Sequence, residues 1–148
     1  MKPITRILVP TDFSAHSSEA LTWAIDLAKR YEAALWLLHA YEPTGYMMPG
    51  GYVSPGAEVL EAERIAREEK LHSAKARALA AGVGSIETFQ IPGPAARGIL
   101  RVADENDCGL IVMGTHGRTG VQRALLGSVA EHVVRLAKCP VLTARAAD

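Results

Sequence analysis

The chain has 148 residues, of which 49% are hydrophobic and 22% are charged, and its formal net charge is zero. This length predicts one domain, spanning residues 1–148, with a substantial core. The balanced charge argues against a general nucleic-acid-binding protein, which usually carries a basic excess. No apolar run approaches the roughly 20 residues of a membrane span, and no signal peptide precedes the first strand. We therefore expect a cytoplasmic protein with no nucleic-acid or membrane partner.

The first half of the chain predicts two buried strands with a helix between them. Arg6–Pro10 and Ala34–Tyr41 are short apolar runs, typical of strands that are covered on both faces. Ser17 is the expected cap of the intervening helix, whose apolar residues recur at three- and four-residue intervals as far as Tyr31. Glu42–Gly56 carries three prolines and four glycines without periodicity, so we expect a flexible or functional loop.

The second half continues the alternation of helices and strands. The composition and periodicity predict helices over Ala57–Ala81 and Ala95–Glu105, a further helix opening at Ser128, and strands over Leu110–Met113 and Val141–Ala144. Ser85–Ile91 alternates polar and apolar residues, which predicts a half-exposed strand at the edge of a sheet. Ser128 and Glu131 match the capping-box pattern at the start of the last helix.

This order predicts an α/β fold, an open and mainly parallel five-stranded sheet with helices on both faces. In such sheets, ligands bind beyond the carboxyl ends of the strands, where the strand order reverses. If the first and fourth strands are neighbours there, the loops Pro10–Asp12 and Gly114–Ser128 converge. The sequence alone leaves that order open.

The loop after the fourth strand has the chemistry of a phosphate site. Its glycines are spaced as Gly114-x2-Gly117-x9-Gly127, and Ser128 follows directly. Glycines allow close approach of the backbone, and the start of the next helix offers backbone N–H groups and partial positive charge. The loop is neither a Walker A loop, because Gly-Lys-Ser/Thr is absent, nor the dinucleotide fingerprint, which usually follows the first strand.

Several candidate residues have a structural explanation beside the functional one. Asp12 lies just beyond a strand and can accept hydrogen bonds from ribose hydroxyls, or it can cap the following turn. Arg118 can pair with phosphate, or it can be an ordinary exposed arginine. Ser128 is expected to cap the last helix with or without a ligand.

No residue is assigned to catalysis. His116 is accompanied by neither a nucleophile elbow nor a metal-ligand pair. His39 is expected in the core or in the wall of the site, and the other histidines, His16, His72 and His132, as surface or capping residues. Cys108 and Cys139 have no metal-ligand spacing, so we expect reduced and mostly buried thiols.

Both ends of the chain carry a family resemblance. Ile7–Ser14, Met113–Gly120, Leu126–Val129 and Lys138–Leu142 resemble ATP-binding members of the universal stress protein family, whose pattern is Gly-x2-Gly-x9-Gly-Ser/Thr. The similarity covers essentially the whole chain. It implies a Rossmann-like sheet of order 3-2-1-4-5, of the adenine nucleotide alpha hydrolase-like type.

The resemblance also implies a ligand and a partner. ATP or another adenine nucleotide would bind, with Mg²⁺ or Mn²⁺ on its phosphates. Asp12 would contact the ribose beside Pro10 and Thr11, Ala40 and Met113 would lie beside the adenine, and Gly114, His116, Gly117 and Arg118 would wrap the ribose and phosphates. Gly127, Ser128 and Val129 would hold the outer phosphates. The family commonly forms homodimers, often through the last strand, here Val141–Ala144.

Three functions follow from these observations. The first is a cytoplasmic, ATP-binding regulatory protein of the stress response, with at most slow ATP hydrolysis because no residue is obviously placed to activate water. The second is a stress-linked protein-interaction module that does not depend on nucleotide and uses the loop Glu42–Gly56. The third, an adenylyl transferase or ATP pyrophosphatase, is disfavoured because Pro10–His16 contains neither a His-x-x-His nor a Ser-Gly-Gly-x-Asp-Ser signature.

Overall fold

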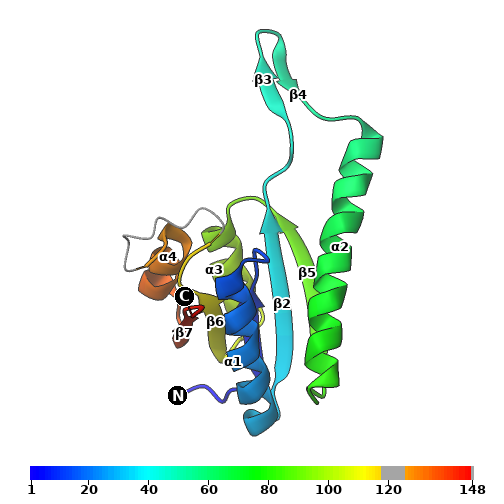
Figure 1. The fold of residues 1–148 in the computed structure, drawn as a ribbon. Coiled ribbons are helices and arrows are strands. Elements are labelled where there is room, and N and C mark those ends of the chain that lie inside the picture. Colours follow the sequence, from blue (N-terminus) through cyan, green and yellow to red (C-terminus); the bar gives the residue numbers. More distant parts are fainter. Residues whose placement is uncertain (118–125, 148) are drawn as a thin grey trace.

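A computed structural model describes residues 1–117 and 126–147 (Figure 1). Five parallel strands form a sheet in the order β5-β2-β1-β6-β7. They are β1 (Arg6–Pro10), β2 (Ala34–Tyr41), β5 (Ile86–Pro92), β6 (Leu110–Gly114) and β7 (Val141–Ala144). Counted within this sheet, the order is the expected 3-2-1-4-5, and the expected edge position of residues 85–91 is confirmed.

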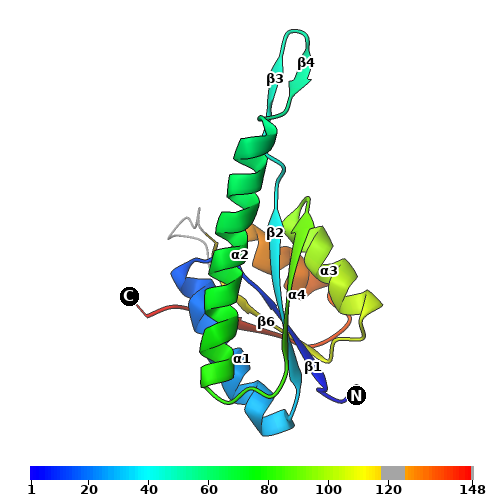
Figure 2. The same ribbon diagram turned by 90° about the vertical axis from the view of Figure 1, so that its right-hand side faces the viewer.

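Alternating side chains explain why helices cover both faces of the sheet. In β1, Ile7 and Val9 belong to the cluster that contains α1 (Ala15–Tyr31) and α2 (Ala57–Ala80). Leu8, between them, belongs to the cluster with α3 (Ala95–Glu105) and α4 (Ser128–Leu136). Successive strand residues point to opposite faces, and all three of these side chains are fully buried. Figure 2 shows α1 and α2 on one side of the sheet and α3 on the other.

The start of α1 differs from the expectation. The helix begins at Ala15, and Ser14, in extended backbone, caps it by accepting a hydrogen bond from the Ser17 N–H at 3.3 Å. Ser17 is buried in the first helical turn, where its hydroxyl donates to the Ser14 carbonyl oxygen at 2.9 Å. The expected cap at Ser17 was wrong because the chain already turns at Phe13, which has a φ of 65°.

The start of α4 also differs. Gly127 occupies the N-cap position in extended backbone and makes no side-chain cap, and Ser128 is the first helical residue. The Glu131 carboxylate instead lies 3.6 Å from the Arg135 guanidinium, one helical turn on. The expected capping box was therefore wrong.

The segment expected as an aperiodic loop contains a hairpin. Strands β3 (Tyr46–Met48) and β4 (Gly51–Val53) pair antiparallel, and together they project away from the sheet beyond the N-terminal end of α2 (Figure 1). Gly51 has a φ of 122°, a conformation that glycine adopts without strain. The signal was present in the sequence, since Pro49 and two glycines separate two short apolar runs.

Within the described part of the chain, no helix combines the length and the apolar character that a membrane crossing requires.

Candidate functional site

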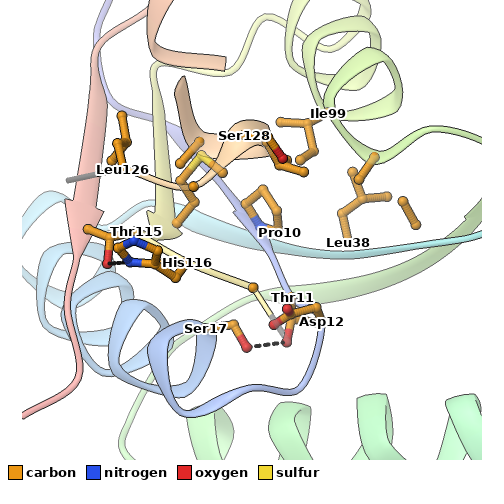
Figure 3. Close-up of a pocket in the computed structure, with 18 residues that line it drawn as sticks. Pro10, Thr11, Asp12, Ser17, Leu38, Ile99, Thr115, His116, Leu126 and Ser128 are labelled. Atoms are coloured by element: carbon orange, nitrogen blue, oxygen red, sulfur yellow. Dashed lines mark hydrogen bonds between the residues drawn. The ribbon is translucent and has the colours of Figure 1, made fainter. Parts of the chain in front are cut away.

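Strands β1 and β6 are neighbours, so the loops that follow them, which begin at Pro10 and Gly114, converge as the sequence analysis considered. Ile7 is paired with Leu110 and Leu8 with Ile111, while β2 pairs with the other side of β1. The strand order therefore reverses between β1 and β6, which is where open α/β sheets bind ligands. The loops that leave these strands border a cavity of about 350 Å³, a volume typical of small-molecule sites (Figure 3).

Every expected site residue that the structure describes lines this cavity. They are Pro10, Thr11, Asp12, Ala40, Met113, Gly114, His116, Gly117, Gly127, Ser128 and Val129. Arg118 lies outside the described residues. The sequence analysis missed further lining residues, namely Ser17, Leu38, Ala95, Ile99, Thr115, Leu126 and Ala130. Leu38 had a signal, because it lies two residues before Ala40 on one strand and so faces the same side.

Asp12 has the structural role considered for it, and it also lines the cavity. Its Oδ1 accepts a hydrogen bond from the Ser14 N–H at 3.0 Å, which fixes the turn before α1. Its Oδ2 lies against Gly117, where a β-carbon would come within 2.8 Å of it. The first strand's loop and the fourth strand's loop therefore meet at this carboxylate.

Close packing leaves little room for a side chain at the other two motif glycines. A β-carbon at Gly114 would lie 2.8 Å from His16 Cβ and 2.9 Å from its carbonyl carbon, so the start of α1 packs directly on the end of β6. A β-carbon at Gly127 would lie 3.0 Å from the Thr115 carbonyl oxygen, which also accepts the Gly127 N–H at 2.7 Å. Close packing at these two glycines brings α1, β6 and α4 to one cavity.

His116 forms part of the cavity wall and is itself held by the protein. His116 is only 9% exposed, and its Nδ1 lies 3.1 Å from Thr115 Oγ1 (Figure 3). Its ring centroid lies 5.5 Å from that of His16. His16, expected as a surface or capping residue, is half-buried, and its Nδ1 accepts the Ala146 N–H at 3.0 Å. His16 thus ties the residues after β7 to the start of α1.

The cavity is lined by both apolar and polar residues. Leu38 and Ile99 lie apart from Thr11 and Asp12, which are near the start of α1, and Ser128 lies at the start of α4 (Figure 3). Among the described lining residues there is no lysine or arginine, and Asp12 and His116 are the titratable ones. The described residues also contain no group of three or more His, Cys, Asp or Glu side chains that could hold a metal ion.

This arrangement suits a ligand with three parts. The apolar side chains of Leu38 and Ile99 can cover a flat ring, and the Asp12 carboxylate can accept hydrogen bonds from hydroxyl groups. The start of α4 offers backbone N–H groups and the positive end of the helix dipole to an anion, and Gly127 adds no capping side chain to compete for them.

The open parallel sheet with a cavity at its switch point defines a doubly wound α/β protein. The chain belongs to the universal stress protein family, because the model of the "Universal stress protein family" matches residues 3–145. A universal stress protein of Methanocaldococcus jannaschii is 37% identical over 141 residues, which cover 95% of this chain and 81% of that protein.

Solved structures agree with this assignment. The universal stress protein UspA from Lactobacillus plantarum matches with a TM-score of 0.84 at 26% identity, covering 98% of this chain and 100% of that one. A universal stress protein solved in complex with cAMP matches with a TM-score of 0.76 at 27% identity, covering 99% of this chain and 100% of that one. The fold of this chain is thus the α/β fold of the family.

Proposed function

We propose that this protein binds ATP, or another adenine nucleotide, in the cavity between β1 and β6. The observation that carries the proposal is the convergence of Asp12 and the start of α4 on one cavity. The two groups offer a carboxylate for ribose and backbone N–H groups for phosphate. The related protein in complex with cAMP supports an adenine nucleotide as the ligand class.

The residues would divide the nucleotide between them. Ala40 and Met113 would lie beside the adenine, and Pro10, Thr11 and Asp12 at the ribose. His116 and Gly117 would border the ribose and inner phosphates, with Arg118 added from the family resemblance. Because the Gly127 N–H is already bonded to Thr115, the N–H groups of Ser128 and Val129 are the ones proposed to donate to the outer phosphates.

The proposed role is regulatory. Nucleotide binding would change the affinity for a partner in the cytoplasmic stress response, with at most slow ATP hydrolysis. Mg²⁺ or Mn²⁺ would bind at the phosphates, where phosphate oxygens and the Ser128 hydroxyl supply the hard oxygen ligands that these ions prefer. The ion would neutralise the charge of the phosphates, because the described lining residues include no lysine or arginine that could do so.

Calorimetric titration tests nucleotide binding. The protein, stripped of co-purified small molecules, is titrated with ATP and Mg²⁺, and saturable binding of one nucleotide per chain is expected. Asp12→Asn keeps an acceptor for the Ser14 N–H but removes the carboxylate charge, so we expect about tenfold weaker binding. Asp26→Ala, at an exposed ion pair with Arg30 on α1, is the matched control and is expected to bind normally. No binding by the wild type contradicts the proposal.

We also propose a homodimer through β7. This strand is an edge of the sheet, and Ile111 and Thr115 donate to the carbonyl groups of Pro140 and Ala144. By the alternation of a parallel ladder, Thr143 then directs its backbone groups away from β6. Thr143→Pro removes an outward N–H, so sedimentation should change from dimer to monomer. A dimer that survives this substitution contradicts the assigned interface.

The hairpin favours a second candidate function, a protein-interaction module that does not depend on nucleotide. Its residues Tyr46, Met47, Met48 and Tyr52 are 58%, 76%, 51% and 57% exposed. Large apolar side chains so exposed are typical of interaction surfaces. Cross-linking in cells, comparing the wild type with a variant whose residues 45–54 are replaced by a short Gly-Ser linker, tests this candidate. Cross-links that persist in the variant, or that require nucleotide, contradict it.

A further inference from the structure

His39 lies behind the turn that carries Asp12 and does not line the cavity. On β2 it alternates with Leu38 and Ala40, which do line the cavity, so its ring points to the opposite face of the sheet. Its Nδ1 lies 2.8 Å from the Thr11 carbonyl oxygen. A carbonyl oxygen can only accept a hydrogen bond, so this contact requires a proton on Nδ1.

This hydrogen bond completes the anchoring of Thr11, the residue before Asp12. The Thr11 N–H donates to the Leu38 carbonyl oxygen at 2.8 Å, and Thr11 Oγ1 accepts the Phe13 N–H at 3.0 Å. Thr11 Oγ1 also donates to Ser17 Oγ at 3.2 Å (Figure 3). With His39 donating to the carbonyl, the polar atoms of Thr11 are held by β2, by the turn itself and by the start of α1. The turn has little freedom to change the direction of Asp12 while these contacts persist.

The His39 ring is in turn held in place. The Phe13 ring packs on it with a centroid distance of 4.5 Å, and Lys70 Nζ lies 5.3 Å from the centroid of the Phe13 ring on α2's side. Phe13 has a φ of 65°, which a bulky residue rarely adopts without support from its surroundings. Burial lowers the pKa of His39, and this effect outweighs the hydrogen bond with the Thr11 carbonyl, which raises it. The charges of Arg67 and Lys70 also lower this pKa, whereas Asp12 raises it. A neutral imidazole with Nδ1 protonated follows.

We propose that His39 is a positioning residue of the nucleotide site, which fixes the Asp12 carboxylate by holding the Thr11 carbonyl from behind. The inference rests on the proposed function, because it assigns a role in nucleotide binding to a residue that does not contact the cavity. It differs from a packing role in one respect. Nucleotide affinity depends mainly on the hydrogen-bond donor at Nδ1 and only weakly on the packing of the ring.

The tautomer of His39 tests the geometry without any ligand. Nitrogen-15 NMR of the imidazole rings at pH 7.5 should show His39 neutral and protonated on Nδ1. A neutral ring protonated on Nε2 overturns the inference, whatever the protein binds.

Substitutions at His39 test the role in binding. His39→Asn keeps an N–H on the atom that corresponds to Nδ1, whereas His39→Leu removes the donor and His39→Gln moves it one bond further out. By calorimetry with ATP and Mg²⁺ we expect affinity within about twofold of wild type for Asn, and about five- to tenfold weaker for Leu and Gln. His72→Leu, at an exposed histidine on α2, is the matched control. If Leu does not fold, the comparison of Asn with Gln decides. Equal losses in Asn and Gln overturn the inference.

A double-mutant cycle tests whether His39 acts through Asp12. In the Asp12→Asn background, His39→Leu should weaken binding by no more than about twofold, because the group it positions is already altered. Losses that multiply as if the two residues were independent overturn the inference and leave the proposed function intact. A wild-type protein that binds no adenine nucleotide overturns both.

Discussion

Replacing Gly117 by alanine should separate the site from the fold. A β-carbon there would lie 2.8 Å from Asp12 Oδ2 and 3.9 Å from Asp12 Cγ. Among the described residues, no other atom outside the adjacent residues of the chain would lie within 4 Å of it. The atom that must move is therefore the end of one side chain. The substitution turns the Asp12 carboxylate away from its position at the cavity and leaves the backbone packing in place.

The size of the effect follows from what Asp12 loses. Turning the carboxylate breaks its hydrogen bond with the Ser14 N–H, at about 0.5–1.5 kcal/mol, and adds a rotamer cost of about 0.5–1.5 kcal/mol. Together these lower the free energy of unfolding by about 1–3 kcal/mol, or the melting temperature by about 3–10 °C for a chain of this size. The loss of a charged hydrogen bond with the ribose weakens nucleotide binding by about 10- to 150-fold.

Thermal melting and calorimetric titration with ATP and Mg²⁺ measure both effects on one sample. Gly84→Ala is the matched control, because a β-carbon at Gly84 meets nothing within 4 Å and its φ is not positive. We expect the control to melt and bind as the wild type does. Wild-type affinity in Gly117→Ala would refute the reasoning, because the carboxylate cannot keep its position beside the added methyl group.

Three further predictions concern other parts of the molecule. Gly127→Val should lower the free energy of unfolding by about 1–3 kcal/mol and weaken nucleotide binding at least about tenfold, since its β-carbon would press on the Thr115 carbonyl oxygen at 3.0 Å. An unchanged midpoint of urea unfolding contradicts this. Because the pKa of His39 is lowered from 6.5 in the folded state, its contribution to stability is complete above pH 6.5 and is lost as the pH falls from 6.5 through the folded pKa. Urea unfolding at pH 7.5 and 5.5 should therefore show a smaller pH dependence in His39→Asn than in the wild type, and equal dependences argue against it. Burial raises the pKa of Cys108 to about 11, so its alkylation by iodoacetamide at pH 8 should be on the order of a hundredfold slower than that of an unperturbed thiol; labelling at the ordinary rate contradicts this.

The strands of the sheet and the helices that cover it were predictable, because burial imposes a pattern of apolar residues on the sequence. A strand covered on both faces is a nearly continuous apolar run, as β1 is from Ile7 to Val9, and the apolar residues of a helix with one buried face recur every three or four positions. The helix starts were less predictable, because several nearby side chains can cap. The turn at Phe13 places Ser14, rather than Ser17, at the N-cap of α1. No local sequence pattern predicts the positive φ of Phe13.

The residues of the site that belong to a sequence motif were predictable, whereas those that packing brings to the cavity were not. The motif marked Gly117 and Gly127, but the reason for Gly127 is contact with the Thr115 backbone, which only the three-dimensional structure reveals. Ala95 and Ile99 reach the cavity because α3 packs across the sheet, and their spacing is that of any amphipathic helix. Nothing in the sequence indicated the contact made by His39, since its partner is the backbone carbonyl of Thr11, in the loop after β1.

The most direct test of the central claim is a crystal structure of the stripped protein with ATP and Mg²⁺. The account predicts a nucleotide between β1 and β6, with a ribose hydroxyl within hydrogen-bonding distance of the Asp12 carboxylate and phosphate oxygens at the N–H groups of Ser128 and Val129. A nucleotide bound elsewhere on the protein, or a cavity that stays empty at saturating ATP, would contradict it.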